Sequence, residues 1–462
     1  MAMQPAMPAD SWPDGPLLAY VGDDFTGSTD VLEAFTTAGI STVLFLKPPD
    51  EPWVKRFAGM RCVGLATNAR SQSPQWMDTH LAAAFARMRA FGAPLLQYKI
   101  CSTFDSSPDT GSIGRAIDLG CNQMPGAWSP TIVGVPRLKR YQAFGNLFAA
   151  IDGVAHRLDR HPTMSRHPVT PMDEADLRVH LALQTPRRIE LIDLVQLQTG
   201  QASARREALT GRDTPVVLFD VIDDATLAEA GRIVWQGRGN GLFSASSSGL
   251  QYALAAHWRN VGLLSPRVAL RRAAPVDVIA VISGSCSPIT AAQIGHARDN
   301  GFVALRLDIP RVLDGGSRAH ELARITALAC DACSQGLSPL VYSAEGPDDP
   351  AVCGFGVVAA KAGLSRPDAS LQIGTALAEI MRQLLDSVPG LRRVVVAGGD
   401  SAGAVASRLD IAALTIDAEL APGAPLCRVW SDNPRRDQLQ IVLKGGQMGA
   451  LDFFRSVRAG RE

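Results

Sequence analysis

The chain has 462 residues, more than one hydrophobic core usually supports, so about two or three domains are expected. Lys and Arg together number 45, as do Asp and Glu, so the net charge is zero and a nucleic-acid partner is not expected. No apolar run approaches the roughly 20 residues of a membrane span, so we expect no membrane partner either. The eight cysteines lie scattered along the chain, which suits a reducing cytoplasm.

The first residues contain Pro, Asp and Gly but no basic segment followed by an apolar one. We therefore expect a disordered leader over 1–16 rather than a signal peptide. Beyond it, apolar runs rich in β-branched residues alternate with helical stretches. This alternation predicts an α/β fold with mainly parallel sheets flanked by helices. Strands are expected at 42–46, 63–66, 95–100, 131–135, 189–194, 216–219, 278–283, 303–307, 340–343, 393–397 and 439–443, and helices at 76–89, 224–236, 250–260, 289–299, 319–333 and 373–388.

The stretch 263–275 contains two prolines and precedes a new expected strand, so it is interpreted as a linker. The prediction is an N-terminal domain over 17–262 and a C-terminal domain over 276–462. Both lengths are ordinary for domains.

Two adjacent carboxylates, Asp23 and Asp24, directly follow the apolar run 17–21. Thr26 lies in the Thr-Gly-Ser-Thr turn that comes next, before a helix-like run. Open α/β sheets bind ligands at the carboxyl ends of their strands, and helix N-termini favour anions. A plain surface turn is the alternative reading, although such turns rarely follow a buried strand so closely. We interpret the segment as part of a functional site.

A second polar segment begins where the expected strand 95–100 ends. Lys99 is followed there by Ser102, Thr103, Asp105 and Ser106. A cation, hydroxyls and a carboxylate together suit a small polyhydroxylated anion. A helix cap would need only one of these residues, so a binding role is favoured over a capping role.

Three further turns, each directly after an expected strand, contain glycines together with serine or lysine residues. Glycine lets a phosphate approach the backbone, and N–H groups at a helix start bind it. The first turn is not a Walker A motif, because no Gly-Lys-Ser/Thr follows. Taken alone, the third turn is interpreted equally well as a flexible turn. The candidate residues are Ser283, Gly284, Ser285, Ser287, Gly398, Gly399, Asp400, Ser401, Gly403, Lys444, Gly445, Gly446, Gln447 and Gly449.

These five segments resemble, in the same order, motifs of the four-carbon acid sugar kinase family. Asp-Asp-Phe-Thr-Gly-Ser-Thr-Asp at 23–30 resembles the opening signature of the family. Lys-Ile-Cys-Ser-Thr-Phe-Asp-Ser at 99–106 closely resembles the branch that contains 3-oxo-tetronate kinases. The turns at 283–287, 398–403 and 444–449 resemble motifs of the family's nucleotide-binding domain. Ala402 and the pair Gln447-Met448 depart from that pattern and leave the specificity subgroup undetermined.

The resemblance implies a two-domain kinase with its active site in the cleft between the domains. The C-terminal domain would bind ATP with Mg²⁺, which needs few protein ligands, so no dedicated metal residues are predicted. The N-terminal domain would present a sugar acid, with Asp23, Thr26, Lys99, Ser102, Thr103 and Ser106 as binding residues. One carboxylate, Asp24 before Asp105, would orient or deprotonate the attacking hydroxyl. The acid itself (threonate, erythronate, a 3-oxo-tetronate or a branched relative such as 3-oxo-isoapionate) is not determined.

Two other functions remain as alternatives. A non-catalytic sensor of nucleotide and sugar acid would keep both pockets. An NAD-dependent dehydrogenase would also use strand–glycine–helix units, but no Gly-x-Gly-x-x-Gly follows the first expected strand. The sequence does not determine the oligomeric state, and a homodimer is one expectation.

Overall fold

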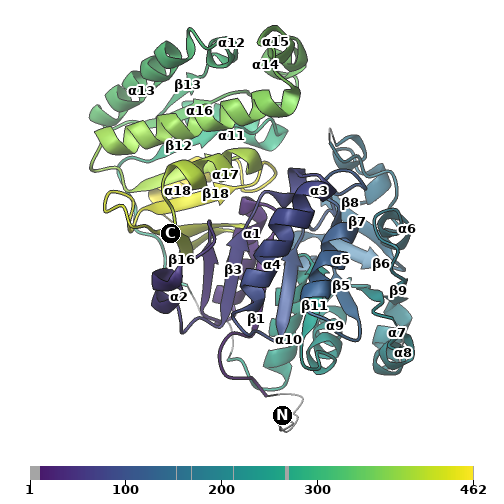
Figure 1. Cartoon of the computed structure of the whole chain (residues 1–462). Helices are drawn as coiled ribbons and strands as arrows, with labels where there is room; N and C mark the ends of the chain where they lie inside the picture. Colours follow the sequence, from purple (N-terminus) through teal and green to yellow (C-terminus); the bar gives the residue numbers. More distant parts are fainter. Residues whose placement is uncertain (1–10, 152, 168, 212, 266–269, 461–462) are drawn as a thin grey trace. The chain divides into compact units, whose positions relative to one another are not determined.

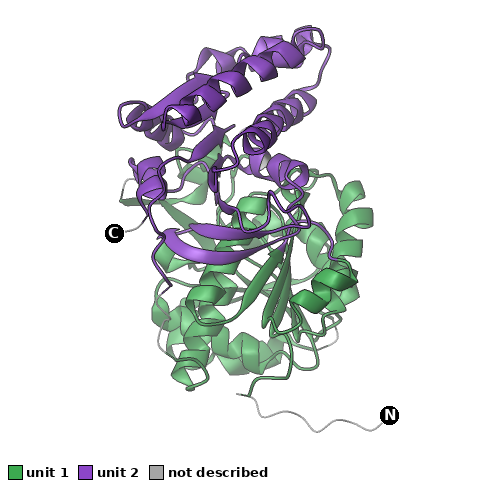
Figure 2. Cartoon of the chain, turned by 90° about the vertical axis from the view of Figure 1, so that its left-hand side faces the viewer, with its two compact units in different colours: residues 1–44, 50–269 green, residues 45–49, 270–462 purple. Residues whose placement is uncertain are grey.

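The computed structural model describes residues 11–151, 153–167, 169–211, 213–265 and 270–460. The chain forms two compact units (Figure 2). Unit 1 contains residues 1–44 and 50–269, and unit 2 contains residues 45–49 and 270–462. The boundary lies within the stretch predicted as the linker, of which 266–269 is outside the described residues. The short segment 45–49 was not predicted to belong with the C-terminal part.

Unit 1 is built on a sheet with the strand order β11-β4-β1-β3-β2 (Figure 1). Strands β11, β4, β1 and β3 pair in parallel, and Gly22 at the end of β1 is in register with Lys99 on one side and Ala66 on the other. The segments that follow these strands therefore begin at the same edge of the sheet. The bounds are β1 (Leu18–Gly22), β2 (Thr42–Phe45), β3 (Cys62–Ala66), β4 (Leu95–Lys99) and β11 (Leu242–Ser246).

Two small sheets complete unit 1. One is parallel, in the order β5-β10-β9, and the other is an antiparallel meander, β6-β7-β8. The meander was not predicted from the sequence, because its strands are short and largely half-exposed and carry Arg, Gln and Asn instead of a continuous apolar run. The bounds are β5 (Ser129–Ile132), β6 (Arg140–Ala143), β7 (Asn146–Ile151), β8 (Val154–Arg157), β9 (Ile189–Ile192) and β10 (Val216–Phe219).

Several helices of unit 1, including α1, α5 and α9, begin at side-chain caps that the sequence supplies. The side chain of Asp223 accepts a hydrogen bond from the N–H of Thr226. The hydroxyl of Thr226 accepts one from the N–H of Asp223, and α9 begins at the next residue. The buried face of α9 packs against α10. The bounds are α1 (Phe25–Thr37), α2 (Glu51–Arg56), η1 (Ala69–Ser71), α3 (Pro74–Trp76), η2 (Met77–Leu81), α4 (Ala82–Arg89), α5 (Ile113–Gln123), η3 (Pro136–Leu138), η4 (Leu158–Arg160), η5 (Met164–Arg166), α6 (Leu177–Ala182), α7 (Leu194–Gln198), α8 (Ala202–Leu209), α9 (Asp224–Gln236) and α10 (Gly249–Asn260).

An aromatic cluster holds the first described residues against unit 1. The ring of Trp12 meets the buried ring of Trp258 edge-on at 5.6 Å, and Trp258 also packs on Phe35 and Trp235. The guanidinium of Arg61 lies over the Trp12 ring. The final part of the predicted leader, residues 11–16, therefore contacts the fold, while residues 1–10 are outside the described part.

Unit 2 contains a mixed sheet with the order β16-β17-β18-β15-β12-β14-β13. The strands from β18 to β13 are parallel, whereas β16 and β17 form an antiparallel hairpin that was not predicted. Ser283, Ala397 and Lys444 form one row across β12, β15 and β18, at the last residue of each strand. The bounds are β12 (Ala280–Ser283), β13 (Phe302–Arg306), β14 (Ser338–Tyr342), β15 (Arg393–Ala397), β16 (Ala413–Ala421), β17 (Ala424–Trp430) and β18 (Gln440–Lys444).

The helices of unit 2 pack in two groups. Helix α16 contacts α13, α17 and β12, and α11 contacts α18 and β13. The core between sheet and helices includes Val281, Val395, Val442 and Phe454. The bounds are α11 (Pro288–Arg298), α12 (Ile309–Leu313), α13 (Arg318–Ser334), α14 (Pro350–Cys353), α15 (Phe355–Lys361), α16 (Arg366–Ser387), α17 (Gly399–Arg408) and α18 (Phe453–Ala459).

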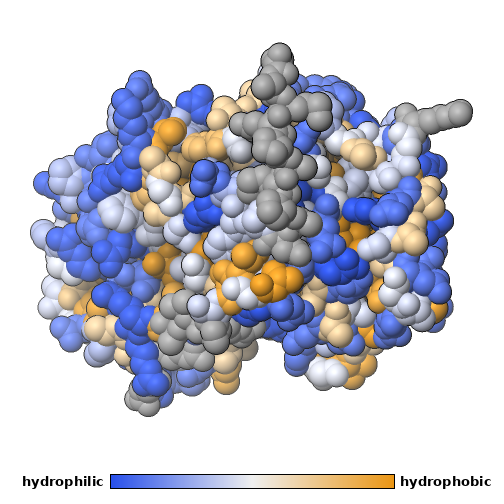
Figure 3. Space-filling model, turned by 90° about the horizontal axis from the view of Figure 1, so that it is seen from below, coloured by the Kyte–Doolittle hydropathy of each residue, from blue (hydrophilic) through white to orange (hydrophobic). Residues whose placement is uncertain are grey.

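One face of the molecule shows how hydrophilic and apolar residues are distributed on the surface. Hydrophilic residues dominate the face shown in Figure 3, with smaller apolar areas between them. Within the described ranges, no helix is both long and apolar enough to cross a membrane.

Candidate functional site

Two carboxylates and an arginine form the centre of the candidate site in unit 1. Asp23 is buried directly after β1, and both of its carboxylate oxygens accept hydrogen bonds from Arg70, each at 2.9 Å. The same guanidinium lies 3.0 Å from Oδ1 of Asp24. Arg70 thus bridges two neighbouring carboxylates, which relieves the repulsion between them.

The segment after β3 is tied to the segment after β1, and this fixes Arg70. The hydroxyl of Thr67 donates to the carbonyl of Gly22 at 2.7 Å. The backbone N–H of Arg70 donates to the carbonyl of Asp23 at 3.0 Å. These two hydrogen bonds fix the backbone position from which the side chain of Arg70 reaches the carboxylates.

Asp24 caps helix α1. Its Oδ1 accepts from the N–H of Gly27 at 2.8 Å, and its Oδ2 accepts from the hydroxyl of Thr26 at 2.6 Å. A carboxylate at a helix N-terminus is stabilised by these donors and by the helix dipole. Thr26, predicted to bind substrate, here orients the neighbouring carboxylate.

The two carboxylates differ in their ionisation. Burial raises the pKa of Asp23, and the charge of Arg70 offsets this only in part. Burial also opposes the ionisation of Asp24, but the charges of Arg70 and Lys99 and the hydrogen bonds from Thr26 and Gly27 outweigh it, so its pKa is lowered. The surroundings therefore favour the ionised form more strongly at Asp24 than at Asp23.

Lys99 is the second cation of this cluster. It ends β4, it is buried, and its Nζ donates to the carbonyl of Ile100 at 3.0 Å. A Cβ atom on Gly27 would lie 2.4 Å from Oδ1 of Asp24 and 3.0 Å from Nζ of Lys99. Glycine at position 27 therefore leaves the space in which the ammonium group and the carboxylate come together.

The loop after β4 brings most of the other predicted residues together. The hydroxyl of Thr103 donates to Oδ1 of Asp105 at 2.7 Å, and Ser102 is half-buried beside it in the chain. Ser106 is buried, and its hydroxyl hydrogen-bonds Phe104, His180 and Gln184. Ser106 thus anchors the loop to α6, whereas Thr103 and Asp105 form a small polar pair.

Arg140 is a further cation associated with this loop. Burial lowers its pKa, while the charges of Cys101 and Asp105 act in the opposite direction. Its Nε is buried without a hydrogen-bond partner among the described residues. Arg140 was not predicted as a site residue, because the meander that carries it was not predicted.

In unit 2, the three predicted turns converge at one edge of the sheet. The N–H of Gly284 donates to the carbonyl of Ala397 at 3.0 Å, and that of Gly398 donates to the carbonyl of Lys444 at 2.9 Å. These hydrogen bonds extend the parallel pairing beyond β12, β15 and β18. A Cβ on Gly446 would lie 2.9 Å from the hydroxyl of Ser285, so the first and third turns are in close contact.

Serines shape the first turn. Ser283 is buried at the end of β12 and its hydroxyl accepts from the N–H of Ser285 at 3.4 Å. The hydroxyl of Ser285 accepts from the N–H of Ser287, and Ser287 caps α11. This leaves a hydroxyl-lined turn at a helix N-terminus, a geometry that suits an anion.

Lys444 is held by one predicted residue, Gly445, and by Thr290, which was not predicted. Its Nζ donates to the hydroxyl of Thr290 at 2.9 Å and to the carbonyl of Gly445 at 3.1 Å. Burial lowers the pKa of Lys444 to about 8. The side-chain amide of Gln293 donates to three carbonyls of the third turn, at 448–450, at 2.8 to 3.1 Å. Thr290 and Gln293, one helical turn apart on α11, therefore shape this turn.

The two glycines of the second turn, Gly398 and Gly399, lie immediately before and at the start of α17. Gly398 adopts φ 110°, a conformation that favours glycine, and a Cβ there would lie 3.2 Å from the N of Ser285. Gly399 is the first residue of α17. A Cβ on Gly284 would lie 2.2 Å from the hydroxyl of Ser401, so these two turns also touch.

The remaining residues predicted to bind ATP lie in or next to the second and third turns. Gly403 lies within α17, and Gly445, Gln447 and Gly449 lie in the third turn. The side chain of Asp400 lies outside the described part of the structure.

Family models match both parts of the chain. Residues 18–254 match the sugar-binding N-terminal domain and residues 280–454 match the nucleotide-binding C-terminal domain. The chain belongs to the four-carbon acid sugar kinase family. It is a sugar-acid kinase, and the dehydrogenase alternative is set aside.

Relatives of known name extend over almost the whole chain. A Paraburkholderia graminis protein named 3-oxo-isoapionate kinase is 62% identical over 98% of this chain and 96% of its own length. A Cupriavidus necator protein named 3-oxo-tetronate kinase is 30% identical over 95% of this chain and 96% of its own length.

Two solved structures share the fold of this chain. A Haemophilus influenzae protein of the DUF1537 family has a TM-score of 0.66 and 21% identity, over 95% of this chain and 99% of its own. A Salmonella typhimurium LT2 protein solved as a candidate tRNA synthase has a TM-score of 0.75 and 24% identity, over 96% of this chain and 98% of its own.

Substitution of Gly27 by alanine tests the packing of the unit 1 site. The new methyl group would displace the carboxylate of Asp24 and crowd Lys99. We expect Gly27→Ala to lower kcat/KM for the sugar acid at least about tenfold, roughly 1.4 kcal/mol, as measured by steady-state kinetics. Gly59→Ala is the matched control, because no atom lies within 4 Å of its Cβ position. Equal kinetics for the two variants would mean that this close approach has no part in catalysis.

Proposed function

We propose that the protein transfers the γ-phosphoryl group of ATP to a hydroxyl of 3-oxo-isoapionate or a closely related short sugar acid. The 62% identity to a protein named 3-oxo-isoapionate kinase supports this acceptor over the 3-oxo-tetronates, whose named kinase in Cupriavidus necator is 30% identical. The observation that carries the proposal is the ionised carboxylate of Asp24, held by Thr26 and Gly27 between two cations, Arg70 and Lys99.

The acceptor would bind in unit 1 at the edge where β1, β3 and β4 end. Lys99 and Arg70 offer positive charge to the carboxylate of the sugar acid. Thr103, Asp105 and Ser102 offer hydrogen-bonding groups to its hydroxyls. Ser106 would support the loop through its contacts with α6, and Asp23 would hold Arg70.

Asp24 would orient the attacking hydroxyl, and Asp105 is the second candidate for this role. A carboxylate with a lowered pKa is a weak base, but it stays ionised near neutral pH and accepts a hydrogen bond from a hydroxyl. Phosphoryl transfer depends mainly on positioning and on charge neutralisation, so an orienting carboxylate suffices.

ATP would bind to unit 2 through the N–H groups of the first two turns and the ammonium group of Lys444. Mg²⁺ would accompany the triphosphate and neutralise part of its charge. In the described ranges no three His, Cys, Asp or Glu side chains gather as a metal site, so phosphate oxygens and water would supply most ligands. An active site between the two domains stays a prediction.

An ATP-consumption assay with a panel of sugar acids tests this proposal. The panel is 3-oxo-isoapionate, 3-oxo-tetronates, threonate and erythronate, and we expect the highest kcat/KM with the first. A higher value for a tetronate would overturn the choice of acceptor. Binding of both ligands without ATP consumption would support the sensor alternative.

Asp24→Asn removes one negative charge and keeps the shape of the side chain. We expect kcat to fall about a hundredfold or more with little change in ATP affinity, because the acceptor hydroxyl loses its orienting carboxylate. Steady-state kinetics and calorimetry measure the two quantities. Asp109→Asn is the control, since Asp109 is an exposed residue of the loop after β4. Near wild-type turnover of Asp24→Asn would remove Asp24 from the mechanism and leave Asp105 as the candidate.

Arg70 is expected to set the pH dependence of the reaction. Burial alone would raise the pKa of Asp24, and Arg70 contributes to lowering it. Without this charge the pKa rises, so Asp24 becomes protonated at a higher pH. We expect the acidic limb of the kcat/KM profile to move to higher pH in Arg70→Ala and to move less in Arg70→Lys, which keeps a positive charge. Circular dichroism checks folding, and a folded Arg70→Ala with an unshifted limb contradicts the role.

Lys444 is expected to control the affinity for ATP. Its pKa of about 8 means that the free enzyme loses this positive charge as the pH rises from 7 to 9. Over this range, kcat/KM for ATP should fall in the wild-type protein and stay flat, at least about tenfold lower at pH 7, in Lys444→Gln. Lys361→Gln is the control, because Lys361 is exposed in the same unit and should behave as wild type. A pH-dependent Lys444→Gln would assign the titration to another group.

A further inference from the structure

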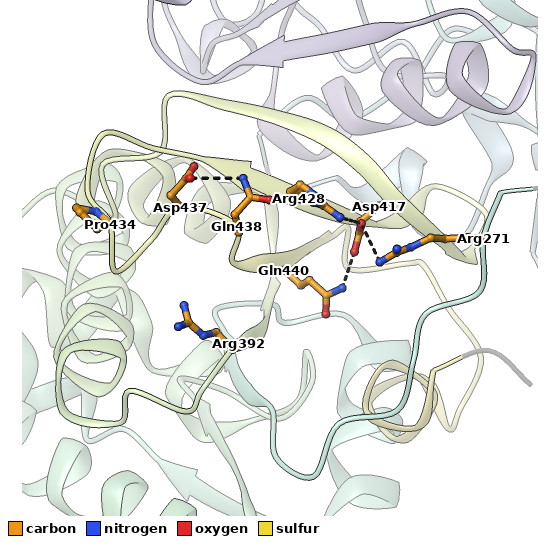
Figure 4. Close-up of a pocket in the computed structure, with 8 residues that line it drawn as sticks. All are labelled: Arg271, Arg392, Asp417, Arg428, Pro434, Asp437, Gln438 and Gln440. Carbon is orange, nitrogen blue, oxygen red and sulfur yellow. Dashed lines mark hydrogen bonds and ion pairs between the residues drawn. The ribbon is translucent and has the colours of Figure 1, made fainter. Parts of the chain in front are cut away.

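Unit 2 contains a cavity of about 490 Å³ that the kinase reaction does not explain (Figure 4). Three arginines, Arg271, Arg392 and Arg428, line it together with Asp417 and Gln440. Its volume is in the range of small-molecule sites, and most of its lining residues carry a charge, unlike those of a typical site. A small charged ligand suits such a lining better than an apolar one.

The carboxylate of Asp417 contacts two of these arginines. Asp417 is almost fully buried and accepts hydrogen bonds from Arg428 and from the amide of Gln440. Arg271 lies 3.5 Å from the same carboxylate, with 69% of its side chain exposed. Burial opposes the ionisation of Asp417, but the contacts with Arg428, Gln440 and Arg271 outweigh it, and the pKa is lowered. Both carboxylate oxygens of Asp417 thus accept hydrogen bonds within the protein.

Positive charge remains in excess around this carboxylate. Arg392 is exposed, and Figure 4 draws no interaction from it to the other lining residues. Arg393 is not part of the lining, but its Nε donates to Oε1 of Gln440 at 2.8 Å, so this amide points its N–H group toward Asp417. Asp437 is the second acidic residue of the lining, and its side chain accepts from the N–H of Ser431. Three guanidinium groups thus line the cavity with two carboxylates.

The cavity is separate from the three phosphate-type turns. Gln440 is the first residue of β18, and Lys444, at the third turn, is the last. The four residue steps between them correspond to about 13 Å along an extended strand. Arg393 likewise begins β15, while Gly398 follows its end. The cavity lies at the amino ends of the strands whose carboxyl ends carry the turns.

We propose that this cavity binds a compact oxyanion of the phosphate or polycarboxylate class. Arg392 offers an uncommitted guanidinium fork, which matches two oxygens of a phosphate or a carboxylate. Arg271 is exposed enough to turn from Asp417 to the ligand, while Arg428 and Gln440 keep Asp417 satisfied.

Calorimetry on the full-length protein tests the site, with inorganic pyrophosphate and citrate as separate probes. Saturating non-hydrolysable ATP analogue keeps the phosphate turns occupied. We expect at least one probe to bind, and Arg392→Gln and Arg271→Gln each to weaken it at least about tenfold. Arg435→Gln is the control, because Arg435 is a 69% exposed arginine of the same unit outside the cavity lining. It should bind the probe as the wild type does.

Two further variants separate this site from the catalytic one. Lys99→Gln and Lys444→Gln remove cations of the candidate catalytic site and should leave probe binding unchanged. Binding of pyrophosphate alone assigns a phosphate ligand, and binding of citrate alone assigns a polycarboxylate. The proposal is overturned if neither probe binds at millimolar concentration. It is also overturned if Lys99→Gln or Lys444→Gln abolishes binding while folded Arg392→Gln retains it.

Discussion

Parallel pairing between neighbouring strands decides where the chemistry of this protein lies. In unit 1, Gly22, Ala66 and Lys99 end three adjacent strands in one register, so the segments after them begin side by side. In unit 2, Ser283, Ala397 and Lys444 do the same. Because parallel strands all run in one direction, residues far apart in the chain meet at one edge of the sheet.

Charge compensation is the second constraint, and it acts where that edge is most buried. Two adjacent carboxylates would repel each other strongly away from water. Arg70 bridges them, and Lys99 approaches Asp24 across the space left by Gly27. The result is an asymmetric pair, in which the pKa of Asp23 is raised by burial and that of Asp24 is lowered by its neighbours. An acceptor carboxylate would bind to a site whose own charges are already balanced.

Fully buried strands and long amphipathic helices were the most predictable parts of the fold. The expected strand 393–397 and the expected helix 224–236 have the bounds of β15 and α9. The meander β6-β7-β8 was missed, because its half-exposed antiparallel strands lack a continuous apolar run. The hairpin β16-β17 was missed as well, and its strands mix apolar residues with Asp417, Glu419 and Arg428. Arg140 and the arginine cavity depend on those elements, so they were not predicted either.

The sequence by itself determined the α/β class, the kinase family and the five polar segments that follow strands. These are local properties, because a strand, its turn and the next helix start are contiguous in the chain. Only the tertiary structure decided which side chains complete each site. Arg70 comes from the segment after β3, and Thr290 comes from within α11, and neither stands in a motif. Their positions depend on strand order and helix packing, since long-range hydrogen bonds and charge pairing form only when distant segments are brought together.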